Sequence, residues 1–224
     1  GDLPFAAGIA VGVVTGDTKA QISGGTVTAT GATDIDVTAS GKHKVATTAD
    51  GSKKTSSGGT AVGVAVAVQV VDSESTASIG GTASLTADAV NVKGEMPVST
   101  FDSKATAGAS GSGVSVAGAV AINVSTLDAK ALVDSGAIDV HGADVGLTAN
   151  STLTNTAKAL GKSESSGDVG VGAAVALNIV NDTTLAALPN SVGLLNAHDL
   201  PLTANATDSI ATTAQAGSTG GTDI

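Results

Sequence analysis

The sequence of 224 residues contains no cysteine, tryptophan or tyrosine, and its only aromatic residues besides histidine are Phe5 and Phe101. The absence of cysteine excludes disulfides, thiolate metal sites and cysteine nucleophiles. It is also compatible with secretion into an oxidising space. Because aromatic side chains are so few, a core must be built from Val, Ile, Leu and Ala.

Arginine is absent too, and the ten basic residues are all lysines, which leaves a formal net charge of -10. The chain therefore has neither the basic footprint of a nucleic-acid-binding protein nor a polybasic membrane patch. No apolar run reaches the ~18 residues of a membrane helix. We expect no nucleic-acid partner and no membrane insertion. The hydrophobic content of 42% and the charged fraction of 13% argue against disorder.

The chain is rich in one repeated apolar run, whose clearest copy extends from Val62 to Val71. Near-copies recur at offsets of 57, 54 and 55 residues, with Ile9, Val66, Val120 and Val175 at equivalent positions. Repeats of this length, made of alternating strand-like segments, are typical of a repeat architecture. We set the repeats at approximately 5–59, 60–113, 114–168 and 169–224.

These repeats predict an all-β fold, a repetitive β-solenoid (β-helix-like) of four ~55-residue units in one continuous segment. Each unit contains about five short strand-like segments, and the number of coils per unit stays open. We expect a polar turn after each apolar run and Gly-rich spacers between units, at residues 51–59, 108–113, 161–167 and 217–221. We interpret the chain as a segment of a longer repetitive protein.

The apolar run has two different faces. In the second copy the odd face is small, with Gly63, Ala65 and Ala67, whereas the even face from Val62 to Val70 is entirely valine. A strand with a Gly and Ala face is expected to be covered closely by another part of the chain. Burial of both faces would fit a parallel sheet.

Three amides, Gln69, Asn123 and Asn178, occupy one equivalent place in successive repeats. Stacked amides can form a hydrogen-bonded ladder along a cross-β axis. Alternatively, each amide only ends a buried strand near its turn. The residue pattern leaves both interpretations open.

No residue set predicts catalysis, and we assign no catalytic, cofactor-binding or metal-ligating residue. The histidines, His43, His141 and His198, lack metal-ligand spacing and are expected on the surface. The Gly-rich spacers lack the context of a phosphate-binding loop. Aspartates gather near expected turns, where they fit turn chemistry, and calcium is the alternative; they are Asp17, Asp72, Asp128 and Asp182 after the run, and Asp34, Asp88, Asp144 and Asp199 before the later strand.

The stretches from Gly111 to Val124 and from Asp168 to Val180 carry the pattern Gly-x-Gly-Val-x-Val-x-Gly-Ala-Val-Ala-x-Asn-Val most clearly. This pattern resembles the repeat regions of very large bacterial surface proteins, the filamentous adhesins and autotransporter-like passengers. The resemblance covers essentially the whole chain and rests on a motif of low complexity. It implies secretion, a β-solenoid stalk and a role in adhesion, biofilm or cell-surface fibres.

Together these observations predict a non-enzymatic structural stalk or fibre segment of a secreted bacterial adhesin, located outside the cell or on its surface. One alternative is a self-assembling extracellular filament subunit whose ends pair. Another is an adhesive module that binds calcium or glycans. The expected partners are flanking repeats of the same protein, a second copy joined end to end, and a host or matrix surface.

Overall fold

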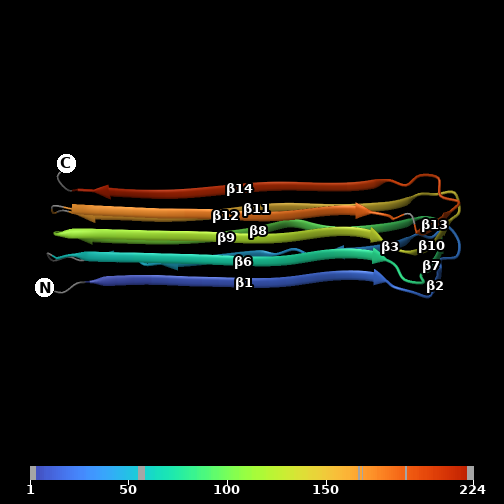
Figure 1. Ribbon diagram of the computed structural model, residues 1–224, viewed down its shortest axis with the longest axis horizontal. Coiled ribbons are helices and arrows are strands. Elements are labelled where there is room, and N and C mark those ends of the chain that lie inside the picture. The colour runs from blue at the N-terminus through green and yellow to red at the C-terminus, as the bar shows by residue number, and fades with distance from the viewer. Residues whose placement is uncertain (1–3, 55–58, 166, 168, 190, 221–224) are drawn as a thin grey trace.

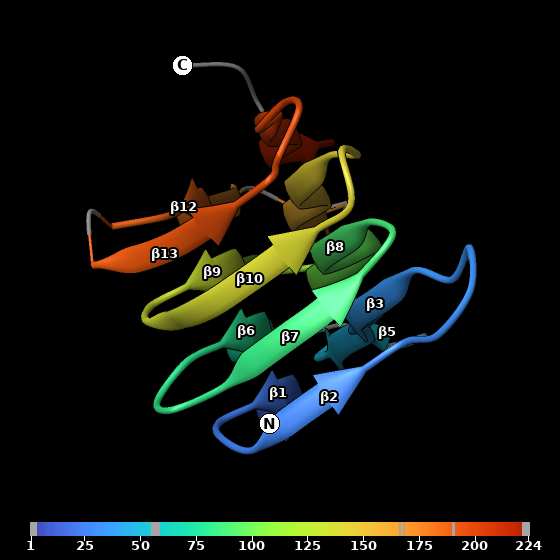
Figure 2. The ribbon, with the colours of Figure 1, turned by 90° about the vertical axis from the view of Figure 1, so that its right-hand side faces the viewer.

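A computed structural model describes residues 4–54, 59–165, 167, 169–189 and 191–220, and this part of the chain is all-β, without a helix. Three parallel sheets surround the interior, and the chain passes through each of them in turn before it returns to the first (Figures 1 and 2). The predicted all-β solenoid is confirmed. The expected spacer residues 55–58, 166 and 221 lie outside the described residues.

The first sheet contains the apolar run. Its strands stack in the order β1 (Phe5–Ile22), β6 (Ala61–Ile79), β9 (Val114–Val133) and β12 (Val169–Ala187). The register pairs Ile9 with Val66, Val66 with Val120, and Val120 with Val175, which are the predicted equivalences. The chain thus makes one coil per repeat length, which answers the question that the sequence left open.

Two further sheets complete each coil. The second is short, with β2 (Thr26–Thr28), β7 (Ser84–Ala87), β10 (Gly136–Val140) and β13 (Val192–Leu195). The third carries the return strands β8 (Val90–Gly111), β11 (Val145–Ser165) and β14 (Leu202–Thr219), with β3 (Ile35–Ser40), β4 (Lys44–Asp50) and β5 (Lys53–Lys54) in succession along β8. Figure 2 shows the short sheet closing one end of the coil.

The strands are longer and fewer than the sequence suggests. The expected polar turn after the apolar run is wrong, because β1 continues through Thr15 and Asp17 to Ile22 without a break. Most of the expected spacers at 108–113 and 161–167 are strand as well, since β8 extends to Gly111 and β11 to Ser165. Side chains still alternate between two faces through these stretches, so the strand continues, with charged residues such as Asp17 and Glu164 on the outer face and small residues such as Ser163 on the inner face.

The interior is a wedge between the first and third sheets. At the end where β1 begins it contains alanine and glycine, including Ala65, Ala67 and Ala105, each fully buried. A Cβ atom on Gly63 would lie 2.3 Å from the carbonyl oxygen of Gly108 in the facing sheet. The sheets are therefore in backbone contact there, and the predicted close cover of the Gly and Ala face is confirmed.

Towards the short sheet the wedge widens and its side chains grow. Phe101, Met96 and Leu153 fill the middle. Beyond them lies a larger cluster of Val, Ile and Leu that includes Leu85 and Ile138. A bulge in β8 accompanies this widening: its register with β11 shifts after Met96, and the backbone of Val98 has a φ of 33°.

The valine face of the run points outward, so the expectation of burial on both faces is wrong. Five ladders of apolar side chains cross the four strands and form what we call the apolar outer face: positions 5, 7, 9, 11 and 13 of β1, with their register partners in 62–70, 116–124 and 171–179. Ile9 is 75% exposed and Val175 58% exposed on the edge strands. The equivalent Val66 and Val120 of the inner strands are half-buried by their neighbours.

Candidate functional site

The most elaborate polar arrangement is a buried amide cluster inside the wedge. Gln69 Nε2 donates to Asn123 Oδ1 over 3.5 Å, between neighbouring strands of the first sheet. Asn123 Nδ2 donates across the core to Asn155 Oδ1 of β11 and to the carbonyl oxygen of Phe101, the latter over 3.1 Å. Thr47 Oγ1 donates to Gln69 Oε1 over 2.9 Å. Gln69, Asn123 and Asn155 are fully buried.

Only one rung of the predicted ladder forms among the described residues. Asn178 pairs in register with Asn123, but its Nδ2 donates to the carbonyl oxygen of Ala211 and to Thr212 Oγ1, over 2.7 and 2.9 Å. The amides therefore form more hydrogen bonds between the first and third sheets than between successive coils. The alternative, that each amide ends its strand, is wrong, because β6 continues from Gln69 to Ile79.

Inward serines also connect the two long sheets. Ser103 Oγ donates to the carbonyl oxygen of Ala67 over 3.2 Å, and Ser163 Oγ donates to that of Ser115 over 2.7 Å. A serine can donate to the facing backbone only because the wedge is so thin at this end. With the amides, these bonds satisfy polar groups that a dry interior would otherwise penalise.

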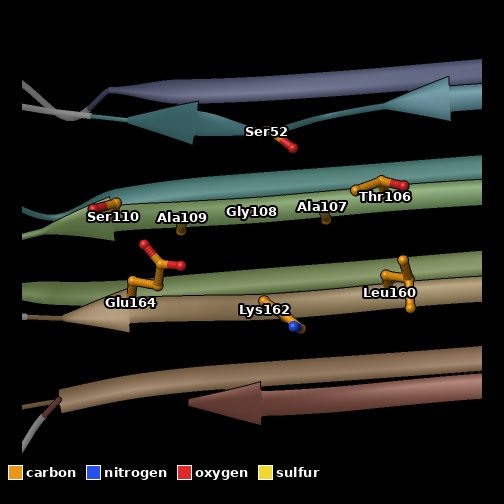
Figure 3. Close-up of a pocket in the computed structure, with 9 residues that line it drawn as sticks. All are labelled: Ser52, Thr106, Ala107, Gly108, Ala109, Ser110, Leu160, Lys162 and Glu164. Carbon is orange, nitrogen blue, oxygen red and sulfur yellow. The ribbon is translucent and has the colours of Figure 1, made fainter. Parts of the chain in front are cut away.

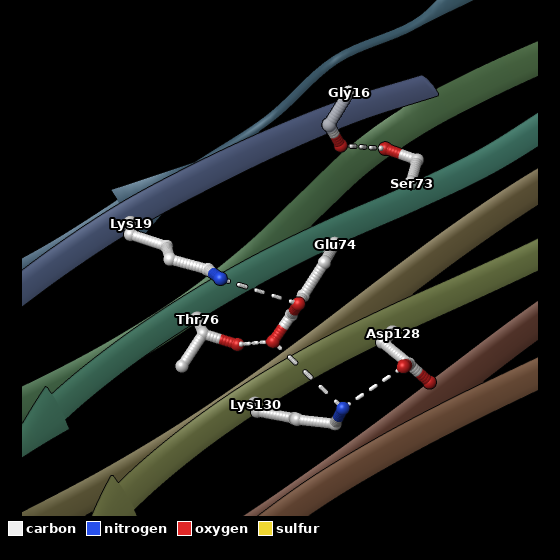
Figure 4. A network of polar contacts seen from close by, with 7 residues as sticks. All are labelled: Gly16, Lys19, Ser73, Glu74, Thr76, Asp128 and Lys130. Carbon is white, nitrogen blue, oxygen red and sulfur yellow. Dashed lines mark hydrogen bonds and ion pairs between the residues drawn. The ribbon is translucent and has the colours of Figure 1, made fainter. Parts of the chain in front are cut away.

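The outer surface of the first sheet changes from apolar to charged half-way along its strands. Beyond the apolar outer face, Figure 4 shows a charged network: Lys130 Nζ lies 2.8 Å from Asp128 Oδ2 and 3.8 Å from Glu74 Oε1, and Lys19 Nζ lies 3.7 Å from Glu74 Oε2. Its hydrogen bond to Asp128 raises the pKa of Lys130. These charged side chains are partly exposed to solvent. Ion pairs in such positions contribute little to the free energy of folding.

The aspartates predicted at turns divide into two groups. Asp34, Asp88, Asp144 and Asp199 precede a strand as predicted. Those after the apolar run lie within long strands instead, and Asp182 points inward on β12. Its Oδ2 accepts a 2.8 Å hydrogen bond from Ser151 Oγ, and burial, with nearby Asp208, raises its pKa to about 6. Ser151 is buried, so this pair offers no accessible nucleophile.

A group of possible metal ligands lies at an exposed turn. His198 Nδ1 lies 3.4 Å from Asp144 Oδ1 and 3.2 Å from Asp199 Oδ2, and one ligand atom of each residue falls within 4.8 Å of the others. All three side chains are exposed, and the backbone N–H of Asp199 donates to Asp144 Oδ1. The hydrogen bonds therefore join the equivalent loops of two adjacent coils.

The remaining histidines lie apart from this group. His141 is exposed, as predicted. His43 is half-buried at the junction of β3 and β4, and a Cβ atom on Gly16 would meet its ring at 2.7 Å. His43 therefore packs against the coil, and the surface prediction is wrong for this residue.

A shallow depression of about 270 Å³ lies on the outer surface of the third sheet. Figure 3 shows the row from Thr106 to Ser110 of β8 above Leu160, Lys162 and Glu164 of β11. The missing side chain of Gly108 creates the hollow between neighbours that carry side chains. Among the described residues that line it, Lys162 is the one cation and Glu164 the one anion, Leu160 is apolar, the others are small, and none is a histidine.

No family model, curated protein or solved structure matches this chain. Within the residues described above there is also no helix that could cross a membrane. The candidate functional site that we consider below is a surface, the apolar outer face, together with the open edges of the sheets. The repeated sequence pattern identifies the run that forms this face, but the predicted burial of its valines is wrong.

Proposed function

We propose that the chain is a non-catalytic rod segment of a bacterial extracellular adhesin or fibre, in which stacked coils provide stiffness. The observation that carries this proposal is the continuous parallel register, in which long strands of successive coils pair along their full length. Each coil is bonded to the next through main-chain hydrogen bonds in three sheets. Such a stack resists bending and extends by adding coils.

The last return strand supports further stacking. Leu202 and Ile210 of β14 point into the wedge, yet they are 49% and 52% exposed. Leu147, the register partner of Leu202, is fully buried by contrast. Another coil placed on β14 would bury both side chains and use its free main-chain groups.

The extracellular assignment draws support from composition. The chain contains no cysteine, and its repeated motif resembles that of large bacterial surface proteins. Immunolabelling of intact, unpermeabilised cells of the source bacterium tests this location. Labelling only after permeabilisation would contradict it.

The rod function is tested by joining two copies of the chain head to tail. Because β1 of the second copy then follows β12 by about one coil length, we expect the copies to stack into one solenoid. The β14 amides of the first copy should become protected from hydrogen exchange, and the pair should unfold in one cooperative transition. Independent unfolding of the copies, with β14 unprotected, would argue against a rod.

A self-assembling filament subunit is the second candidate, favoured by the same open edges of β1 and β14. The contact would be head to tail and would not close, so filaments would lengthen with concentration. Electron microscopy at increasing concentration separates this candidate from a rod segment, which forms no filaments by itself.

A further inference from the structure

The apolar outer face is a flat array without a charged or hydrogen-bonding side chain. Its five ladders contain Phe, Val, Ile, Leu, Ala and one Gly, contributed by all four strands of the first sheet. The opposite outer surface carries Thr, Asn and Lys, for example Thr148, Asn150 and Lys158 of β11. The stack of coils therefore carries the apolar outer face on one side and a polar surface on the opposite side.

The size of this face is that of an interface. With a strand spacing of ~4.8 Å and a rise of ~3.3 Å per residue, it covers roughly 600 Å². This reaches the upper end of the largest apolar patch on typical monomers, about 300–600 Å². Two such faces in contact would bury about 1,200 Å², the lower limit of stable protein–protein interfaces.

The shape of the face also favours a stacked partner. Figure 1 shows the long strands running nearly straight and parallel, with little twist. Flat sheets are unusual and are typically stabilised by stacking against another sheet. A second copy offers the same grid of branched side chains at the same spacing, so that the ridges of one array can enter the grooves of the other.

We propose that two copies of this chain pair face to face through the apolar outer face, with their stacking axes parallel. The two-fold axis lies along the central ladder, which contains Ile9, Val66, Val120 and Val175. Strands of the two copies then run antiparallel across the interface. The apolar halves overlap, and the charged halves extend into solvent on opposite sides.

The charged network determines this orientation. A two-fold axis along the strands would place Glu74 of one copy over Asp128 of the other, and like charges would meet in the interface. An axis along the stack avoids this contact. It also keeps both stacks advancing in the same direction, so additional coils would extend the same interface.

This pairing does not depend on the stalk function, because it rests on one exposed face of the chain. It also differs from end-to-end assembly in its product. A two-fold face-to-face contact closes at a dimer, whereas head-to-tail contacts continue. Failure of the tandem-copy experiment would leave the dimer prediction intact, and the reverse also holds.

Sedimentation over a wide concentration range tests the proposal, and we expect a monomer–dimer equilibrium. Val120→Lys places a charge at the centre of the array twice per dimer and should weaken dimerisation at least about 100-fold. The matched control is Thr154→Lys, which adds the same charge to an equally half-buried inner-strand position on the opposite surface and should leave the dimer unchanged. Val120→Thr keeps the branched shape and should weaken the dimer about 10-fold.

The orientation can be measured with a single spin label, because the chain has no cysteine. Asp128→Cys lies eight residues along β9 from the proposed axis, so two labels should be about 50 Å apart. An axis along the strands would bring them within about 20 Å.

Several results would overturn the proposal. These are a chain that stays monomeric, an open series of larger species, a dimer that tolerates Val120→Lys in a folded variant, and a short label distance. A monomer that floats with phosphatidylcholine vesicles would overturn it in favour of a lipid partner.

Discussion

Gly63 of β6 lies directly against Gly108 of β8, so close that a Cβ atom on Gly63 would come within 2.3 Å of the Gly108 carbonyl oxygen and 2.6 Å of that of Gly51. Face-to-face sheets normally lie about 10 Å apart with side chains between them. Here backbone meets backbone. This contact decides which face of the apolar run points inward.

Gly63→Ala should therefore destabilise the protein by about 1–3 kcal/mol, because a methyl group can be accommodated only if the facing backbone moves. Denaturant unfolding at low protein concentration provides the measurement. The control is Gly118→Ala on the outer surface of β9, where an added Cβ meets nothing within 4 Å. That change should be neutral or stabilise by about 0.4–1 kcal/mol. Equal effects of the two substitutions would contradict the wedge.

The amide cluster should be more sensitive on the inner strands than at the edge. Asn123→Ala removes the partner of buried Gln69 and Asn155 and should cost about 2–4 kcal/mol. Asn178→Ala should cost less than about 1.5 kcal/mol, because its partners lie on exposed β14. The same unfolding measurement applies, and a reversed order would disprove the assignment of the cluster.

The two phenylalanines should differ sharply. Phe101 is fully buried in the middle of the wedge, whereas Phe5 is 61% exposed on the apolar outer face. Phe101→Ala should destabilise the monomer by about 3–5 kcal/mol, and Phe5→Ala by less than about 0.5 kcal/mol. Thermal or chemical unfolding in the monomeric concentration range compares them directly.

Asp182 should make stability depend on pH. Burial raises its pKa in the folded chain to about 6 from an ordinary 3.8, so folding favours the protonated carboxyl. The resulting stabilisation is complete below the unfolded-state pKa and is lost as pH rises through about 6. Unfolding curves of the wild type and Asp182→Asn, measured from pH 3 to pH 8, should differ by an amount that changes across this window. A constant difference would refute the shifted pKa.

Much of the fold follows from residue patterns alone. Period-two alternation identifies the strands, and the equivalence of Ile9, Val66, Val120 and Val175 predicts the register of the first sheet. The aspartates before the later strands also lie where turn chemistry places them. These features depend on local backbone geometry and repetition, which a single sequence records.

Strand lengths were harder to predict. Asp17 and Thr15 suggested a turn, and Gly108 to Gly111 suggested a spacer, yet both stretches are strand. An outward position of a surface sheet accepts polar residues, and an inward position of a thin wedge accepts only small residues such as Gly, Ala and Ser. Both requirements select polar and small residues, which are also typical of loops. Local propensity therefore could not distinguish a strand from a loop in these stretches.

By itself, the sequence determined that the chain repeats, that its strands are two-faced, and that one face is small and the other branched and apolar. Only the tertiary structure decided that the small face is the interior. Hydrophobicity predicts the opposite, since valine is buried more readily than glycine. Contact between the backbones of two long sheets overrides that preference, because no valine fits where Gly63 meets Gly108.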